Sequence, residues 1–454
     1  MSPRQFALLA SGALLLAACA GDAKSLGSQD TAGVSPVSPT TGSVPPITIP
    51  ATYTLQAGDS PSAVAERFGI TVAELEAANA DSADYYRFLV GAEINLIPPP
   101  TTVPPSTAVP PASIPLTTAA PITGRVTMAF TGDVLAHRAV NRAAALPDGT
   151  YDYTAMFTNL APVVGAVDLA VCHLESPIAP DEQVIVPPPK LAVDPAIGPA
   201  LAAAGYDRCS TASNHALNGG AAGVDATIQG LAAAGLGQSG MAASADQALP
   251  PILEINGVRV VHLSYSYGFD GDRAPEGEPW RANLIDPARI ISDAQAERAL
   301  GAEVVVVSMH WGASKTVGAT AEQRRVAQAV TASGAIDLIV GHHAHVLQPI
   351  EQVNGVWVVW GLGNLLSDHP TSSEWPASTQ DGAVVTVAVQ RGSDGAISVE
   401  TPAVHPTWCD TEHGYVIRFT TEADDPSLSA SVREQLRVSQ QRTADVLGPY
   451  LAPA

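Results

Sequence analysis

Lysine and arginine are scarce in this 454-residue chain. It has 22 of them against 44 aspartates and glutamates, which gives a formal net charge of −22. A chain this acidic has no basic surface for a phosphate backbone, so we expect no nucleic-acid partner. With 46% hydrophobic residues, the chain can still build a large core and two or three domains.

Cysteine is scarce as well, with four residues. If Cys19 belongs to an export signal, an odd number remains and at least one cysteine stays unpaired. Cys172 and Cys209 each end an apolar run. The sequence therefore predicts that these two are small buried hydrophobes rather than a disulfide or metal ligands.

Residues 1–19 are typical of an export signal. Arg4 supplies a positive start, and Phe6–Ala18 is an apolar run too short to span a bilayer as a stable helix. The segment Leu16-Ala17-Ala18-Cys19 resembles the bacterial lipoprotein box. The resemblance implies lipidation of Cys19 and a membrane anchor on the extracellular or periplasmic side. The alternative is an ordinary secretory signal with an incidental cysteine.

Residues 20–51 are a disordered linker by composition, and residues 52–98 follow as a small module. The module's pattern predicts the order strand, helix, helix, strand, with a turn at Gly58-Asp59-Ser60 and Asn79 closing the second helix. This pattern resembles a LysM module, a family that binds peptidoglycan. The resemblance implies glycan contacts by Gly58, Asp59, Ser60 and Asn79. The alternative is a folded spacer that has lost its affinity for sugar.

Residues 99–123 form a second linker, rich in proline and threonine, and residues 124–420 are predicted to form one α/β domain. Short apolar runs alternate with helical stretches along this domain. Residues 421–454 are predicted to be a C-terminal helical extension, with a helix from Leu428 to Leu447. The predicted strands are Val126–Phe130, Asp168–Val171, Tyr206–Ser210, Val258–Leu263, Val304–Met309, Leu338–Val340 and Trp357–Trp360.

Side chains that can bind a metal follow five of these strands. The carboxyl ends of strands are where α/β folds place their sites, so the five segments are expected to meet. Carboxylate, amide and imidazole groups without a thiolate suit a pair of divalent cations such as Mn, Fe or Zn. A surface histidine cluster is the alternative for the last segment. The candidates are Asp133, Glu175, Asn214, His215, His310, His343 and His345.

The stretch Arg125–Asp368 resembles the bacterial capsule-synthesis CapA family, also called the poly-gamma-glutamate biosynthesis family. The resemblance lies in residues 131–135, 174–177, 213–217, 310–312, 341–351 and 361–365. That family is similar to calcineurin-like metallophosphoesterases, whose fold is a four-layer α-β-β-α sandwich.

The resemblance also implies roles for the candidate residues. Asp133 and His345 would hold one metal ion, and Glu175 would bridge to a second. His215 would be the general acid, with a plain hydrogen-bonding role as its alternative. The ligands of the second ion would be Asn214, His310 and His343.

Some positions depart from the family pattern. Leu135 stands where related phosphoesterases carry a histidine, so the first metal site is expected to be weak or empty. His173 and Asn218 stand where Asn and Asp are expected, and Ser314 replaces a Glu.

Two functions remain open. One is a metal-dependent hydrolase of an envelope polymer or phosphoester. The other is a non-catalytic, wall-binding accessory subunit that works with capsule-polymer synthase subunits.

Overall fold

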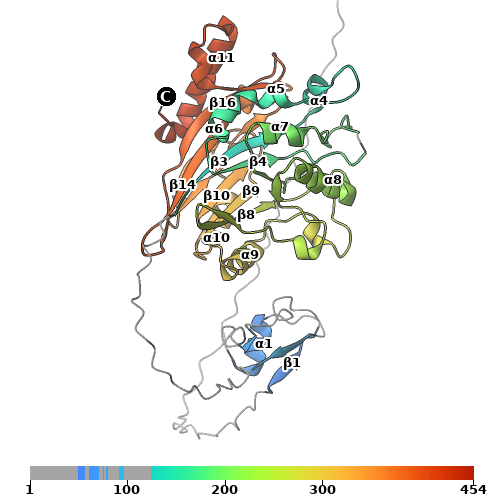
Figure 1. The fold of residues 1–454 in the computed structure, drawn as a ribbon, viewed down its shortest axis with the longest axis vertical. Coiled ribbons are helices and arrows are strands. Elements are labelled where there is room, and N and C mark those ends of the chain that lie inside the picture. The colour runs from blue at the N-terminus through green and yellow to red at the C-terminus, as the bar shows by residue number, and fades with distance from the viewer. Residues whose placement is uncertain are drawn as a thin grey trace, which may run out of the picture. The chain divides into compact units, whose positions relative to one another are not determined.

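The computed structural model describes residues 50–56, 61–70, 75, 78–79, 92–96, 124–181 and 183–453. The chain divides into two compact units, Met1–Pro115 and Leu116–Ala454 (Figure 1). Cys19, Gly58, Asp59, Ser60, the second linker and residues 20–49 of the first linker lie outside the described residues, so their predicted roles stay predictions. Within the described residues, no helix has the length and apolar character needed to cross a membrane.

The first unit contains the first strand, the first helix and the closing strand that its sequence predicts, and most of the predicted second helix lies outside the described residues. Strand β1 (Thr52–Thr54) pairs antiparallel with β2 (Glu93–Asn95), and α1 (Pro61–Phe68) ends before Gly69, whose φ of +68° suits a helix stop. Leu55, Val64 and Ile94 pack in its core.

Asn79 has an internal role in this unit. Its side chain is 1% exposed, and its amide donates to the carbonyls of Leu75 and Asn95 and accepts from the Asn95 N–H. The side chain thus fastens the chain to β2 and has no free polar atom directed at solvent. The expected glycan contact by this side chain does not fit that geometry.

The second unit contains two sheets. The first has the strand order β17-β16-β14-β3-β4-β5-β6, with β13 beside β3 and β15 beside β14; the second has the order β11-β12-β10-β9-β8-β7. The first sheet comprises β3 (Gly124–Val134), β4 (Leu169–Leu174), β5 (Arg208–Ser210), β6 (Gly237–Ser239), β13 (Asn364–Leu366), β14 (Asp381–Arg391), β15 (Ile397–Val399), β16 (Ala403–Asp410) and β17 (Val416–Phe419). The second comprises β7 (Leu253–Ile255), β8 (Val258–Ser266), β9 (Val304–His310), β10 (Leu338–His342), β11 (Ile350–Val353) and β12 (Val356–Val359).

The two sheets pack face to face, and helices cover both outer faces (Figure 1). Strand alternation explains this layering, because Val304 and Val306 of β9 point to the core between the sheets while Val305 and Val307 point to the helices. The predicted four-layer α-β-β-α sandwich is confirmed. The helices are α4 (Arg138–Ala144), α5 (Thr154–Phe157), α6 (Ala161–Val164), α7 (Ile197–Ala203), α8 (Gly220–Ala233), α9 (Pro287–Ala299), α10 (Ala321–Thr331) and α11 (Ala430–Leu447).

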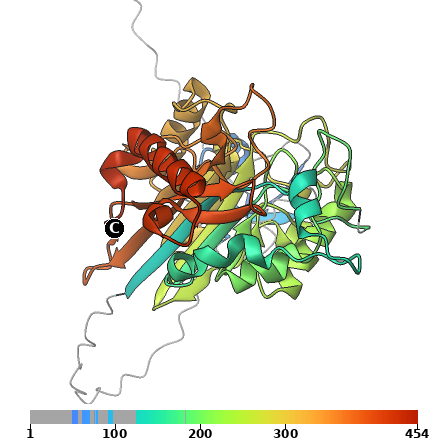
Figure 2. The same ribbon diagram turned by 90° about the horizontal axis from the view of Figure 1, so that it is seen from above.

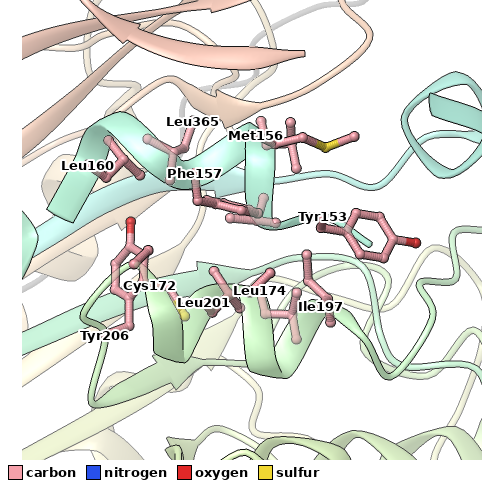
Figure 3. Close-up of a cluster of buried hydrophobic side chains, with 14 of the residues drawn as sticks. Tyr153, Met156, Phe157, Leu160, Cys172, Leu174, Ile197, Leu201, Tyr206 and Leu365 are labelled. Atoms are coloured by element: carbon pink, nitrogen blue, oxygen red, sulfur yellow. The ribbon is translucent and has the colours of Figure 1, made fainter. Parts of the chain in front are cut away.

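The outer core of the first sheet is closely filled. Figure 3 shows side chains of α5, α7 and β4 meeting there, among them Phe157, Leu201 and Leu174. All three are at most 1% exposed. This packing holds β4, and with it the residues that follow β4, in place.

The predicted C-terminal helix is confirmed as α11, which lies across the C-terminal strands in Figure 2. Ser429 caps its first turn by accepting from the Val432 N–H. Val432 and Leu436 pack against Trp408 of β16. The helix is therefore part of the second unit's packed structure.

The prediction for two of the cysteines is wrong. Cys172 and Cys209 are both buried, as expected, but they form a disulfide. They are direct partners in the parallel pairing of β4 with β5, and their Cα atoms are 4.4 Å apart. The register between two strands is not visible in the sequence. Cys409 is free and buried.

Candidate metal centre

The predicted site residues meet at the carboxyl ends of the parallel strands. Asp133 of β3 lies beside His173 of β4, and His310 of β9 lies beside His342 of β10. The strands run further into the motifs than the apolar runs alone predict, so these four residues end strands rather than starting loops. Rigid strands therefore position this side of the site.

Glu175 lies at the middle of the histidines. Its Oε1 is 3.9 Å from Nε2 of His310, 3.9 Å from Nε2 of His345 and 4.0 Å from Nε2 of His215. Both carboxylate oxygens are buried without a hydrogen-bond partner. Burial raises the pKa of Glu175 well above its usual range. A buried carboxylate of this kind is costly unless a cation faces it.

Asp133 is the second buried carboxylate. Its Oδ2 accepts the backbone N–H of His343 at 3.1 Å, and its Oδ1 lies 3.2 Å from Nδ1 of His342 with no hydrogen bond between them. Burial alone would raise the pKa of Asp133, but the side chains of His342 and His345 hold it well below its usual range. The two imidazoles therefore favour the charged form of Asp133.

An uncommon backbone conformation brings two imidazoles of the loop that follows β10 into the site. His343 has a φ of +83° and His345 a φ of +56°, both in the left-handed region. Such residues cost about 1–3 kcal/mol each and persist where the surrounding structure holds them. Gly341 has no room for a side chain, since a Cβ there would lie 1.9 Å from the Trp360 carbonyl oxygen. The backbone at Trp360 therefore holds the start of this loop in one conformation.

The histidines of the site have shifted pKa values with different causes. Burial lowers the pKa of His343 to about 4 and lowers that of His215. For His345, burial is outweighed by Glu175 and Asp133, which raise its pKa to about 9. Neutral imidazoles are competent ligands, so His343 is ready to bind a cation at neutral pH.

Asn214 and His310 converge on one point. Asn214 Oδ1 is 2.8 Å from His310 Nε2, and His310 is fully buried. Two atoms that bind the same cation are each about 2 Å from it and therefore lie about 3 Å from each other. The separation of these two atoms fits a shared cation. The structure brings all six predicted ligand residues and His215 together.

Three further residues belong to the site although the sequence assigned them no role. His173 Nε2 lies 2.9 Å from His310 Nδ1, and its Nδ1 lies 2.8 Å from Ser210 Oγ. Tyr267 lies over His343, with ring centroids 4.7 Å apart. Asp270 accepts from the Asn214 side-chain amide at 2.7 Å. His173 was visible as a departure from the family pattern, whereas Tyr267 and Asp270 lie in a loop without a motif.

The sequence predicts a missing metal ligand at position 135. In the structure the Leu135 side chain is buried there, and it has no atom that can bind a metal. His137 and His369 pack against each other nearby, with ring centroids 4.7 Å apart. His137 Nδ1 accepts the Asp368 N–H at 3.2 Å, so its Nε2 carries the proton when the ring is neutral. In that state His137 cannot replace the missing ligand.

The donor set fits divalent cations. Within the described residues, three groups place their donor atoms within 4.8 Å of one another, and all of their residues are buried. Oxygen and nitrogen donors without thiolate suit Mn, Fe or Zn. The unpartnered oxygens of Glu175 and Asp133 are where such ions would be held. The groups are Asp133–His173–His342, His173–Glu175–His310 and Glu175–His343–His345.

Residues 127–369 match the family described as bacterial capsule synthesis protein PGA_cap, and residues 53–89 match the LysM domain. The first match covers more than half of the chain, so this protein belongs to the PGA_cap family.

Among its relatives is the PGA biosynthesis protein CapA of Bacillus subtilis, 27% identical over 62% of this chain and 72% of that protein. The capsule biosynthesis protein CapA of Bacillus anthracis is 27% identical over 58% of this chain and 63% of its own length. A probable polyglutamine synthesis accessory protein of Mycobacterium tuberculosis is 28% identical over 45% of this chain and 57% of its own length.

Solved structures with a similar fold include a calcineurin-like phosphoesterase from Bacillus subtilis. It has a TM-score of 0.40 and 16% identity, over 71% of this chain and 98% of that one. The NAD nucleotidase of Haemophilus influenzae has a TM-score of 0.41 and 12% identity, over 73% of this chain and 64% of that one.

Proposed function

We propose that the second unit is a metal-dependent hydrolase of a phosphoester, acting at the cell surface in the synthesis of a capsule or poly-gamma-glutamate-type polymer. The observation that carries the proposal is Glu175, whose two buried oxygens lack partners while three histidines face one of them. The family membership and the relatives' part in capsule synthesis support the setting.

In this proposal, Asp133 and His345 would hold one cation and Glu175 would be shared with a second. The second cation is held by Asn214, His310 and His343. Bound cations stabilise the negative charge that develops on the reacting phosphate and lower the pKa of water.

His215 is the proposed general acid. Its Nε2 faces Glu175, and its side chain is only about one-tenth exposed. When the ring is doubly protonated, the proton at Nε2 would pass to the leaving oxygen, which otherwise departs as an unstable anion, and the neutral ring would keep its proton on Nδ1. This role needs no bond between His215 and a metal ion.

A second candidate is a non-catalytic accessory subunit that supports polymer synthesis or export. It is favoured by the description of the mycobacterial relative as an accessory protein. In that case the same buried residues would bind metal for stability alone, and synthase subunits would be the partners.

The location of the protein is part of the proposal. The LysM match supports peptidoglycan as the ligand of the first unit. Cys19 would carry the lipid that holds the chain at the membrane, on its extracellular or periplasmic side.

The test uses the full chain purified without chelator. We expect bound Mn, Fe or Zn by mass spectrometry and hydrolysis of a chromogenic phosphodiester with added Mn²⁺. His215→Ala should keep its metal and lose activity by about 10²–10⁴-fold. Bound metal without turnover in the unaltered protein would favour the accessory role, and absence of bound metal would overturn the metal centre.

A further inference from the structure

The loop that follows β8 orients two asparagines of the site. Asp270 Oδ2 accepts from the side-chain amide of Asn214 at 2.7 Å, and Asp272 Oδ2 accepts from that of Asn218 at 3.0 Å. Asn214 is a proposed metal ligand, whereas Asn218 contacts His215. Two carboxylates in one short loop thus serve two different parts of the centre.

The contacts of Asn218 leave only one orientation for its amide. Its Oδ1 accepts the Leu191 N–H at 2.8 Å, while its Nδ2 faces the Asp272 carboxylate. If the Asn218 amide were flipped, its NH₂ group would face the Leu191 N–H and its oxygen would face the Asp272 carboxylate. Both contacts are repulsive, so the hydrogen bonds exclude the flipped orientation.

The same orientation determines the tautomer of His215. Asn218 Oδ1 lies 2.8 Å from His215 Nδ1, and an amide oxygen can only accept. His215 Nδ1 therefore carries a proton. The other ring nitrogen, Nε2, faces Glu175 and is the one that can exchange a proton with a substrate.

We propose that Asp272 is a positioning residue for His215, acting through the amide of Asn218 to keep the proton on Nδ1 and to direct Nε2 into the centre. This inference rests on the proposed role of His215 as the acid. It assigns a function to a loop residue 54 positions beyond Asn218 that no motif marks.

Lys190 completes the arrangement at the surface. Its Nζ lies 3.2 Å from Asp272 Oδ1 and 3.3 Å from the Asn218 carbonyl oxygen. The chain has only three lysines, Lys24, Lys190 and Lys315. Lys190 holds the Asp272 carboxylate in place from the solvent side, and its half-exposed position makes its own contribution modest.

The experiment compares three carboxylate-to-amide changes in one loop of the full-length protein. Asp272→Asn should keep the metal content of the unaltered protein. Its kcat on an alkyl phosphodiester should fall by about 10–100-fold, because the alkoxide leaving group must be protonated. Its kcat on a p-nitrophenyl diester should change little, because the nitrophenolate leaves without protonation.

The matched variants separate positioning from general damage to the loop. Asp270→Asn should lower metal content, because Asp270 holds Asn214. Glu276→Gln changes an exposed carboxylate that has no described contact with Asn218 or His215, and it should change neither quantity. Loss of metal in Asp272→Asn, or equal losses on both substrates, would overturn the proposal.

A second measurement does not depend on activity. In the metal-free protein, nitrogen-15 NMR of the imidazoles should show neutral His215 protonated at Nδ1, with a His215→Gln variant identifying its signals. Asp272→Asn should raise the share of the Nε2–H form. An Nε2–H tautomer in the unaltered protein would sink the inference. Absence of hydrolysis in the unaltered protein would instead count against the proposed function.

Discussion

Single residues of the candidate metal centre are held by contacts on one side, which leave other polar atoms available to a cation. Asp133 Oδ2 accepts a backbone N–H while its Oδ1 has no partner, and Asn214 donates to Asp270 while its oxygen faces His310. Fixing one side of a ligand in this way keeps the other side in place for a cation. Glu175 differs, because neither of its oxygens has a partner.

Glu175 is therefore expected to matter more for metal binding than any one histidine. Without it, two cations would face each other with no shared anion, so Glu175→Ala should lose most bound metal. His310→Ala should lose about one ion's worth, and His215→Ala almost none. Plasma mass spectrometry of the three variants gives the pattern. Equal metal content in Glu175→Ala and the unaltered protein would refute a bridged pair.

Gly341 is a residue on which the shape of the histidine loop depends. A Cβ at this position would overlap the Trp360 carbonyl oxygen of the neighbouring strand end, and backbone cannot move aside cheaply. Gly341→Ala should cost about 1–3 kcal/mol of unfolding free energy or more. Gly223→Ala is the control, since nothing lies within 4 Å of a Cβ there and α8 should gain up to about 1 kcal/mol. Denaturant unfolding measures both.

At the scale of elements, strand ends build one side of the centre and loops build the other. β3, β4, β9 and β10 deliver Asp133, His173, His310 and His342 through parallel pairing. The loop after β8 then delivers Tyr267, Asp270 and Asp272. Strands place their residues by register, whereas this loop places its residues by hydrogen bonds to side chains.

The C-terminal helix is joined to the first sheet by an ion pair whose carboxylate is buried. Arg442 of α11 donates twice to Asp381 of β14, at 2.6 Å each, and Ser439 donates to the same carboxylate at 2.7 Å. Burial raises the pKa of Asp381, against the effect of Arg442. Arg442→Met leaves this carboxylate buried and less well paired, which should destabilise the second unit by about 3–5 kcal/mol.

Denaturant unfolding checks this expectation, with Arg325→Met as the control. Arg325 pairs with Glu322 on the exposed face of α10, and surface pairs of this kind contribute little. Unfolding curves that are the same for both variants would show that the buried pair does not anchor α11.

At the scale of the whole molecule, the LysM module and the candidate metal centre occupy separate compact units. The module has its own small core and contributes no residue to the metal-binding groups found among the described residues. Binding to the wall and chemistry at the centre should therefore be separable.

Removing residues 52–98 should abolish co-sedimentation of the full chain with purified peptidoglycan and leave metal content unchanged. The separate core of the first unit is the reason, because the second unit keeps all of its packing. Sedimentation that persists without the module would argue that it is a spacer.

Cys19→Ala tests the anchor. Without the thiol no lipid can be attached, and the chain should move from the membrane to the soluble fraction. Fractionation followed by immunoblotting measures this. Unchanged membrane association would favour an anchor other than Cys19.

Much of the second unit could be predicted from the sequence, for a physical reason. Strands buried on both faces are continuous apolar runs, as in Val304–Met309, and their ends are marked by the first metal-binding side chain. The order of the runs then predicts parallel sheets and a shared edge. The same reasoning predicted that six candidate ligands would meet, and the structure brings them together: Asp133, Glu175, Asn214, His310, His343 and His345.

Contacts between distant segments needed the tertiary structure. The Cys172–Cys209 bond depends on strand register, and the buried role of Asn79 depends on how its loop meets β2. Asp270 and Asp272 belong to the centre only because the loop after β8 folds back over Asn214 and Asn218. The sequence by itself determined which elements form and which candidate ligands they carry, because both depend on local pattern. The tertiary structure decided what holds those ligands in place, because hydrogen bonds between loops far apart in the chain leave no periodic signal.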